Sequence, residues 1–438
     1  MLTALYTLII LGLCIVVHEL GHFISAILVG AIVKEFSIGF GQIIFSRKIK
    51  GIRFSIRIIP LGGFVKIIGD SPEDEGKDNP RYFTNLSFIK RFIVLISGVA
   101  FNLIFAFIIL FTLYLTGIKT PIAPPMIKKV LKNTPAQKAG LKKYDIILSI
   151  NGKEIKNIMQ LSKTLQKYKN KIITLKVKRE GKILNIHTKL YYDKEYKKYM
   201  LGVQIEPFLP AIVGDVIVNT PAYMIGLKKN DKILKINKTP IHSFFELMDI
   251  LKGYKDKKVK LIIQRGTKLI EKEIKVETIK IGKSEIVNIG IEPLAVKTET
   301  KKYTFSESIK NSLFEIISII KLNKVIFVEI LKGEISFKKV VGGPVMIYQQ
   351  TYREAKSGQS NLWHFIALLN ITLFIFNILP IPLLDGGHIL FLIIEKIIGS
   401  PIPQNILSFI NSIFFALLIL LAIYVTLNDI LKLFLINP

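Results

Sequence analysis

Hydrophobic residues gather in four long blocks along the chain. The blocks are residues 2–30, 92–118, 361–384 and 397–428, and the last three contain no charged residue. Each block is longer than the roughly 20 residues that cross a bilayer core as a helix. The pattern therefore predicts an integral membrane protein with four transmembrane helices. The first block has no Lys or Arg before it and is longer than the apolar core of a signal peptide, which argues against cleavage.

The loops between the blocks predict the orientation. Lys and Arg outnumber Asp and Glu in the short loop between the first two blocks. Such basic loops favour the cytoplasmic side, whereas long segments cross the membrane largely regardless of charge. We therefore expect the long segment between the second and third blocks to be extracytoplasmic. The net charge is +29, and we interpret the lysines of this long segment as a solvated surface, with attraction to anionic lipid headgroups as the alternative. A nucleic-acid role is not expected on that side.

That long segment contains an internal repeat. "TPAQKAGLKKYDIILSINGKEI" from Thr134 matches "TPAYMIGLKKNDKILKINKTPI" from Thr220 at an offset of 86 residues without a gap. In each copy an Asp precedes an alternating strand, which is followed by a helix-like segment and a second alternating strand. This order resembles PDZ domains of the bacterial, circularly permuted type, which bind extended peptides at a sheet edge. The alternative is a pair of rigid spacers with empty grooves.

Ionisable residues interrupt the first block at "VVHELGHF". Charged groups at membrane depth are costly, so they indicate function. His18 and His22 are four residues apart and share one helix face, where their imidazoles can hold one zinc ion. Glu19 would stand beside the metal as a general base toward water. The alternative is a chance match whose polar groups join helices.

A catalytic zinc site needs a third protein ligand and an open fourth position. His187 and His242 lie in the repeats, and His364 opens the third block, where an interfacial residue is expected. Asp385, in "FNILPIPLLDGGHIL", follows two prolines that break a helix and precedes two glycines that permit tight turning. Its carboxylate is the candidate third ligand, and His388 is interpreted as a polar boundary residue.

These motifs resemble one known family. "HELGHF" in the first span, "NILPIPLLDGGH" after the third and the paired PDZ insertion are similar to the site-2 protease family of intramembrane zinc metalloproteases, of the bacterial regulator-of-sigma-E protease (RseP) type. The resemblance covers nearly the whole chain. It implies that His18, His22 and Asp385 bind Zn2+, that Glu19 activates water, and that Asn377 holds the substrate backbone or the developing oxyanion. A helix–helix hydrogen bond is the alternative for Asn377.

The resemblance also implies an architecture. We expect a polytopic α-helical membrane protein with four transmembrane helices, a membrane-associated β-segment ("FSIGFGQIIF" and "RFSIRIIPLGGFVKIIGD") and two extracytoplasmic PDZ domains of α+β type. The expected parts are an N-terminal membrane part, PDZ domain 1, PDZ domain 2, an amphipathic linker helix region and a C-terminal membrane part, at residues 1–118, 119–205, 206–298, 299–360 and 361–438. "SGVAFN" matches the family motif of the second span incompletely, because Val99 stands where relatives have proline.

The implied function is regulated intramembrane proteolysis by a zinc endopeptidase of the bacterial cytoplasmic (inner) membrane. Its partners would be the lipid bilayer and transmembrane substrates such as single-span anti-sigma factors or remnant signal peptides, with the PDZ domains filtering or sensing them. One alternative is a catalytically silent PDZ scaffold that binds peptide tails, which would need none of the zinc residues. Another is a transporter, which would commonly show repeats among its spans rather than outside them.

Overall fold

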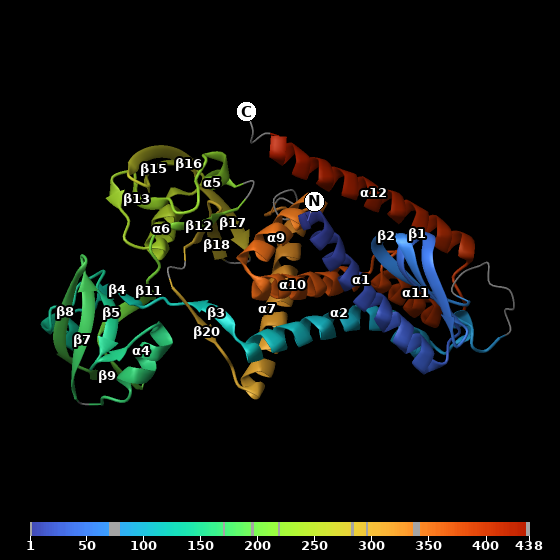
Figure 1. Ribbon diagram of the computed structural model, residues 1–438, viewed down its shortest axis with the longest axis horizontal. Coiled ribbons are helices and arrows are strands. Elements are labelled where there is room, and N and C mark those ends of the chain that lie inside the picture. The colour runs from blue at the N-terminus through green and yellow to red at the C-terminus, as the bar shows by residue number, and fades with distance from the viewer. Residues whose placement is uncertain are drawn as a thin grey trace. The chain divides into compact units, whose positions relative to one another are not determined.

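The described residues form two compact units. A computed structural model describes residues 2–69, 79–169, 171–193, 197–217, 220–281, 284–294, 297–335 and 342–434. Unit 1 comprises Met1–Ile118 with Lys302–Pro438, and unit 2 comprises Lys119–Lys301 (Figure 1). Among the described residues, four helices are long and apolar enough to cross a membrane: Ala4–Val29, Phe88–Thr116, Gln359–Asn377 and Asn405–Asp429. The prediction of four transmembrane helices is confirmed.

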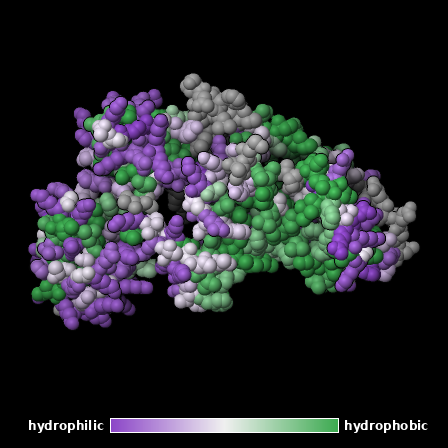
Figure 2. Space-filling view, viewed as in Figure 1, coloured by the Kyte–Doolittle hydropathy of each residue, from purple (hydrophilic) through white to green (hydrophobic). Residues whose placement is uncertain are grey.

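Unit 1 is built around helix α2 (Phe88–Thr116). Helices α1 (Leu2–Val29), α7 (Phe305–Leu331) and α10 (Gln359–Asn377) pack against it. Their shared core consists of aliphatic side chains such as Leu110, Ala367 and Ile371, which are almost fully buried. Apolar side chains also cover the outside of these helices, and Figure 2 shows that hydrophobic residues gather on unit 1 while unit 2 is largely hydrophilic. Such an exposed apolar surface is typical of contact with lipid.

The third hydrophobic block breaks as a helix at its two prolines, where the sequence predicted the break. Helix α10 ends at Asn377, because Pro380 and Pro382 lack the N–H groups that would continue it. A helix that the sequence did not predict, α11 (Asp385–Ile398), follows; its 14 residues are too few to span a bilayer. Helix α12 (Gln404–Phe434) starts after two further prolines, later than the predicted residue 397. Two shorter helical elements also lie in the described part of unit 1: 3-10 helix η1 (Phe83–Asn85) and α9 (Pro344–Ser357).

The loop between α1 and α2 forms the predicted β-hairpin. Strands β1 (Val33–Ile49) and β2 (Ile52–Ile67) are antiparallel, and Lys50 and Gly51 make the turn with φ of 47° and 86°, as in a type I′ turn. Both strands bend at glycines with positive φ, so each contributes two legs to one curled sheet. The register places the legs in the order 43–49, 52–57, 33–38 and 63–67. Leg 63–67 is therefore an edge.

Unit 2 contains the two repeats. Their matching elements recur at the offset predicted by the sequence. In the first repeat these are α3 (Pro135–Lys138), β5 (Ile146–Ile150), β6 (Lys153–Glu154), α4 (Ile158–Leu165), β7 (Ile172–Arg179) and β8 (Lys182–Lys189). Their counterparts are α5 (Pro221–Met224), β13 (Lys232–Ile236), β14 (Thr239–Pro240), α6 (Phe244–Leu251), β15 (Lys258–Arg265) and β16 (Lys268–Lys275). Each repeat has its own apolar core.

Further strands extend the sheet of the first repeat and form separate two-stranded sheets in unit 2. In the first repeat, β4 (Pro125–Val130) lies between β5 and β11 (Val203–Pro207), giving the order β11-β4-β5-β7-β8. In the second, β12 (Val213–Val216) pairs with β19 (Ile291–Pro293). The remaining elements are η2 (Lys252–Tyr254), the pair β9 (Tyr191–Asp193) and β10 (Lys198–Met200), and the pair β17 (Glu277–Ile281) and β18 (Ser284–Asn288). Strands β3 (Ile118–Pro121) and β20 (Thr298–Lys301) pair where the chain enters and leaves the unit.

Candidate metal centre

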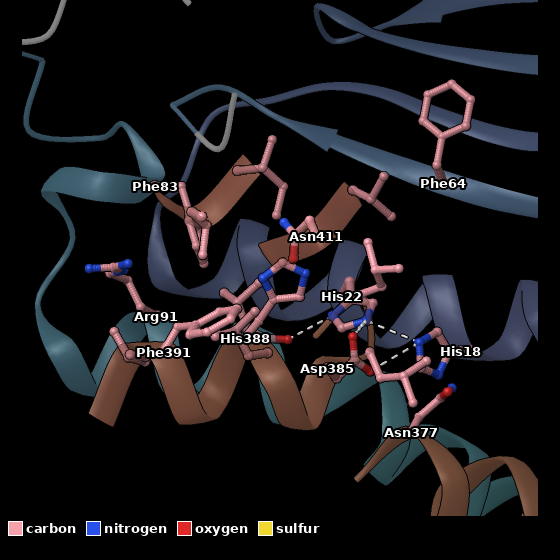
Figure 3. Close-up of a pocket in the computed structure, with 18 of the residues that line it drawn as sticks. His18, His22, Phe64, Phe83, Arg91, Asn377, Asp385, His388, Phe391 and Asn411 are labelled. Carbon is pink, nitrogen blue, oxygen red and sulfur yellow. Dashed lines mark hydrogen bonds and ion pairs between the residues drawn. The ribbon is translucent and has the colours of Figure 1, made fainter. Parts of the chain in front are cut away.

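Three side chains predicted from the sequence converge in unit 1. His18 and His22 project from α1, and Asp385 is the first residue of α11 (Figure 3). The Nε2 atoms of the two imidazoles are 3.2 Å apart. Asp385 Oδ2 is 3.1 Å from Nε2 of His18, and Oδ1 is 3.4 Å from Nε2 of His22. Among the described residues, these three side chains form the group of potential metal ligands whose atoms lie close enough together to hold one ion.

The spacing of these atoms fits zinc. Ligands at roughly 2.0–2.1 Å from a tetrahedral zinc ion are separated by about 3.3–3.4 Å, close to the separations in the cluster. Asp385 Oδ2 is buried, and apart from its approach to Nε2 of His18 it has no polar partner among the described residues. Two imidazole nitrogens that face each other at 3.2 Å also compete for one proton unless a cation lies between them. The donor set of two imidazoles and one carboxylate leaves an open fourth position, as in catalytic zinc sites.

The crossing of α1 and α2 holds His22 in place. Gly21 lies against the Ser97 carbonyl, and the hydroxyl groups of Ser25 and Ser97 are 2.6 Å apart. The ring of His22 lies over Gly98, where any side chain would overlap it. Nδ1 of His22 is 2.8 Å from the Val94 carbonyl oxygen, which can only accept a hydrogen bond, so Nδ1 carries the proton. This bond fixes the tautomer and leaves the Nε2 lone pair free for a metal.

The segment before α11 positions Asp385. Leu383 adopts a left-handed backbone conformation with φ of 78°, which redirects the chain at the start of the helix. The two glycines after Asp385 have a different role from the predicted one: neither has positive φ. Instead a Cβ at Gly386 would collide with the carbonyl of Ile378, and one at Gly387 with the carbonyl of Ile381. They permit close packing of residues 378–384 on the helix rather than tight turning.

A cavity of about 680 Å³ surrounds the cluster and is lined by other predicted residues. Glu19 and Asn377 both line it, and Figure 3 shows Asn377 on the His18 side of the cluster. The edge leg of β2 also borders the cavity, through Phe64, Val65 and Ile67. His388 was interpreted as a boundary residue, but it lines this cavity, because the helical turn that carries Asp385 also carries its side chain.

The remaining histidines have other partners. His364 Nε2 is 2.7 Å from Glu315 of α7, and the other oxygen of this carboxylate accepts a hydrogen bond from Tyr114. His187 contacts Thr174, and His242 contacts Glu246, both in unit 2. None of them belongs to the metal cluster, as predicted.

One residue near the cluster received no role in the sequence analysis. Asn102 of α2 is 0% exposed, and its side-chain amide is 3.3 Å from Nδ1 of His18. Its sequence signal was an amide in an otherwise apolar span, at the end of the incompletely matched "SGVAFN" motif. Buried amides in membrane helices often join helices, so the sequence alone did not connect Asn102 with the histidines.

Each repeat of unit 2 contains a buried ion pair. Arg179 Nε lies 2.6 Å from Asp145, and Arg265 Nε lies 2.7 Å from Asp231; both carboxylates are 0% exposed. Burial alone would raise the pKa of Asp231, but hydrogen bonds from Arg265 and from the backbone N–H of Lys228 outweigh it, and the pKa is lowered overall. These ion pairs fix the turn before each alternating strand.

The two repeats also contact each other within unit 2. Tyr144 of the first repeat stacks on His242 of the second, with ring centroids 3.9 Å apart, and its hydroxyl donates to Glu246. Burial raises the pKa of Tyr144, and the Glu246 carboxylate raises it further. A cavity of about 450 Å³ lies beside this contact and is lined by residues of both repeats, including Lys142, Lys178 and Lys232.

Comparison with known proteins decides the family. The sequence profile of peptidase family M50 matches residues 6–421. The chain belongs to this family. Family M50 comprises intramembrane zinc metalloproteases, so the predicted family and enzyme class are confirmed.

Individual relatives agree with the family over their full length. The chain is 30% identical to the regulator of sigma E protease of Haemophilus influenzae, covering 97% of this chain and 98% of the relative. It is 29% identical to the regulator of sigma-E protease RseP of Salmonella typhimurium, covering 95% and 96%. A PDZ domain of an SdrC-like protein from Listeria monocytogenes matches with 20% identity and a TM-score of 0.19, covering 20% of this chain and 93% of that domain. This M50 protein is thus a multi-pass membrane metalloprotease.

Proposed function

We propose that this M50 protease cleaves transmembrane segments at the cluster of His18, His22 and Asp385, which hold Zn2+, with Glu19 as the general base. The observation that carries the proposal is the convergence of three ligand atoms from α1 and α11 at separations that suit one tetrahedral zinc ion. The cavity around them supports it, because hydrolysis inside a membrane requires room for water.

The chemistry follows from the positions of the side chains. Bound zinc supplies a Lewis acid that polarises the carbonyl of the scissile peptide and makes water acidic near neutral pH. A Glu19 carboxylate oxygen takes the proton of the attacking water and passes it to the nitrogen of the leaving amine. Asn377, at the end of α10, donates from its side-chain amide to the substrate carbonyl or to the oxyanion that develops there.

The edge leg of β2 supports a role for the hairpin in substrate binding. A transmembrane helix hides its peptide bonds, so it must unwind before cleavage, and an edge strand can replace the lost hydrogen bonds. Residues 63–67 form such an edge, and Phe64, Val65 and Ile67 line the cavity that contains Glu19. We infer that the unwound substrate adds to this edge as a strand.

The finer assignments of domain, side and substrate belong to the same proposal. We divide the chain into residues 1–118, 119–205, 206–298, 299–360 and 361–438, and the constant offset between the elements of the repeats supports the two PDZ-like parts. Unit 2 is proposed to be extracytoplasmic in a bacterial cytoplasmic membrane, supported by the basic loop between α1 and α2. The proposed substrates are single-span proteins such as anti-sigma factors, and remnant signal peptides, which unit 2 filters or senses.

One experiment tests the catalytic assignment. The full-length protein is purified in detergent, bound zinc is measured by atomic absorption, and cleavage of a tagged single-span substrate is followed on gels. Glu19→Gln should retain zinc and lose about 10²–10⁴-fold in rate, the usual contribution of a general base. Asp385→Ala should lose both zinc and cleavage. His187→Ala, in unit 2 and outside the cluster, is the matched control and should retain both.

Two results would contradict the assignment. Wild-type cleavage by Glu19→Gln would exclude this carboxylate as the base. Zinc at wild-type occupancy in Asp385→Ala would exclude this residue as a ligand. The filter role is tested separately by attaching a bulky folded domain to the extracytoplasmic end of the substrate, which should slow cleavage by the full-length protein.

A further inference from the structure

The proposed zinc site contains a second imidazole, that of His18, and the question is which of its two ring nitrogens carries the proton. His18 Nε2 points to Asp385, so Nε2 must carry the lone pair when His18 binds zinc, and Nδ1 must then carry the proton. The neighbour of Nδ1 is the side-chain amide of Asn102. In the structure its Nδ2 lies at 3.3 Å from Nδ1, so two donors would face each other once zinc is bound.

The amide of Asn102 has an unused acceptor. Its Oδ1 is buried and has no hydrogen-bond partner among the described residues. The oxygen and nitrogen of an Asn amide have nearly the same shape, and their assignment follows from the hydrogen-bond network. A half-turn about the last side-chain bond therefore exchanges Oδ1 and Nδ2 and places Oδ1 against Nδ1 of His18 without moving any atom outside the amide.

His22 already has the corresponding arrangement. Its Nδ1 faces the Val94 carbonyl oxygen, an obligatory acceptor, at 2.8 Å. Val94, Gly98 and Asn102 are spaced four residues apart and thus lie on one face of α2. This face would supply an oxygen acceptor to each histidine, one from the main chain and one from a side chain, with the glycine between them making room for the ring of His22.

We propose that Asn102 is a positioning residue of the metal centre, and that its side-chain oxygen accepts the Nδ1 proton of His18 when zinc is bound. The proposal rests on the proposed function in assuming that His18 binds zinc. The bond holds His18 in the tautomer and ring orientation that present Nε2 to the metal. Loss of such a partner typically weakens metal affinity by 10–100-fold.

The test measures zinc affinity of the full-length protein in detergent by competition with a chelator. Asn102→Leu removes the acceptor and should weaken zinc binding by about 10–100-fold. Asn102→Asp retains an oxygen acceptor at the same place and should bind zinc within a few-fold of wild type. Asn370→Leu is the matched control: Asn370 is also 0% exposed in the membrane core, but it contacts Cys14 and not the cluster, and its zinc affinity should be unchanged.

The variants separate the outcomes. Wild-type affinity in Asn102→Leu overturns the proposal. If Asn102→Leu does not fold, Asn102→Asp decides. If the amide nitrogen were the true partner of His18, the new carboxylate would repel the Nδ1 lone pair and zinc affinity would fall sharply. A loss of zinc affinity in Asn102→Asp as large as that in His18→Ala therefore overturns the proposal. The proposed function fails separately: His18→Ala would then bind zinc as tightly as wild type.

Discussion

Gly98→Ala adds one methyl group at the face of α2 on which the ring of His22 rests. The new carbon would stand 2.6 Å from Cε1 and 2.8 Å from Cδ2 of the ring, and nearer still to Nε2. Ordinary carbon contacts are about 3.5–4.0 Å, so the ring has to move by about 1 Å. The ring cannot move freely, because its Nδ1 is hydrogen-bonded to Val94.

The magnitude follows from these two constraints. Overpacking a tight site costs about 1–3 kcal/mol, and in this position the strain falls on Nε2 of His22, the atom proposed to bind the metal. A cost of this size corresponds to a zinc affinity about fivefold to about 150-fold weaker. Cleavage should fall by about 100-fold even at saturating zinc, since a misplacement of about 1 Å has an effect of that order. Alanine favours a helix over glycine by about 0.5–1 kcal/mol, which offsets part of this cost in the metal-free fold.

The assay compares the full-length variant with wild type by chelator competition for zinc and by cleavage of a single-span substrate. Gly253→Ala is the control, because a Cβ at Gly253 meets nothing within 4 Å and its φ is not in the left-handed region. Thermal unfolding without metal detects any general damage. Wild-type zinc affinity and cleavage in Gly98→Ala would refute the view that this glycine makes room for the metal-binding ring.

Further predictions concern substrate binding and unit 2. Asn377→Leu should keep its zinc and lose about 10²–10³-fold in kcat, as expected for an oxyanion donor; an unchanged kcat would favour a helix-joining role. Val65→Pro removes an N–H from the edge leg and should slow cleavage without zinc loss, and equal cleavage would exclude strand addition there. Asp231→Ala leaves the partly exposed Arg265 without its partner and should destabilise the second repeat by about 3 kcal/mol, visible as faster amide exchange in residues 211–293 of the full-length protein. Folding lowers the pKa of Asp231, so this carboxylate stabilises the fold at pH values above its unfolded pKa of about 3.9 and loses this effect as pH falls through its folded pKa. The stability of Asp231→Ala should therefore depend less on pH in this range than that of wild type. An unaltered pH profile of unfolding would contradict the ion pair with Arg265.

Much of the fold could be predicted because its signals are local. Twenty or more apolar residues predict a membrane helix, and the self-match at a fixed offset predicts two similar domains. The bent hairpin was predicted as a β-segment, but its four legs were not, since their order depends on where Gly39, Gly41 and Gly62 bend the strands. Helix α11 was missed because its apolar residues merge with the neighbouring blocks, and only the prolines on either side separate it.

In the candidate site, too, only residues with a local sequence pattern could be predicted. His18, Glu19 and His22 were found because their spacing is itself a helix pattern, and Asp385 because it follows a broken helix. Asn102 and Gly98 were noticed within "SGVAFN" but received no role, because their role depends on which face of α2 crosses α1. The glycines after Asp385 were correctly singled out but wrongly explained: a sequence shows that a side chain is missing, whereas only the packing shows which carbonyl occupies its place.

The distribution of the proposed zinc ligands has a consequence for biosynthesis. His18 lies in α1 and Asp385 begins α11, so a ribosome must make the chain as far as Asp385 before both are present. If these residues hold zinc as proposed, a nascent chain that ends before Asp385 would carry the histidines without their carboxylate and would lack the complete site. Zinc binding would then join α1 to α11, so proteolytic activity would begin only after these helices have assembled.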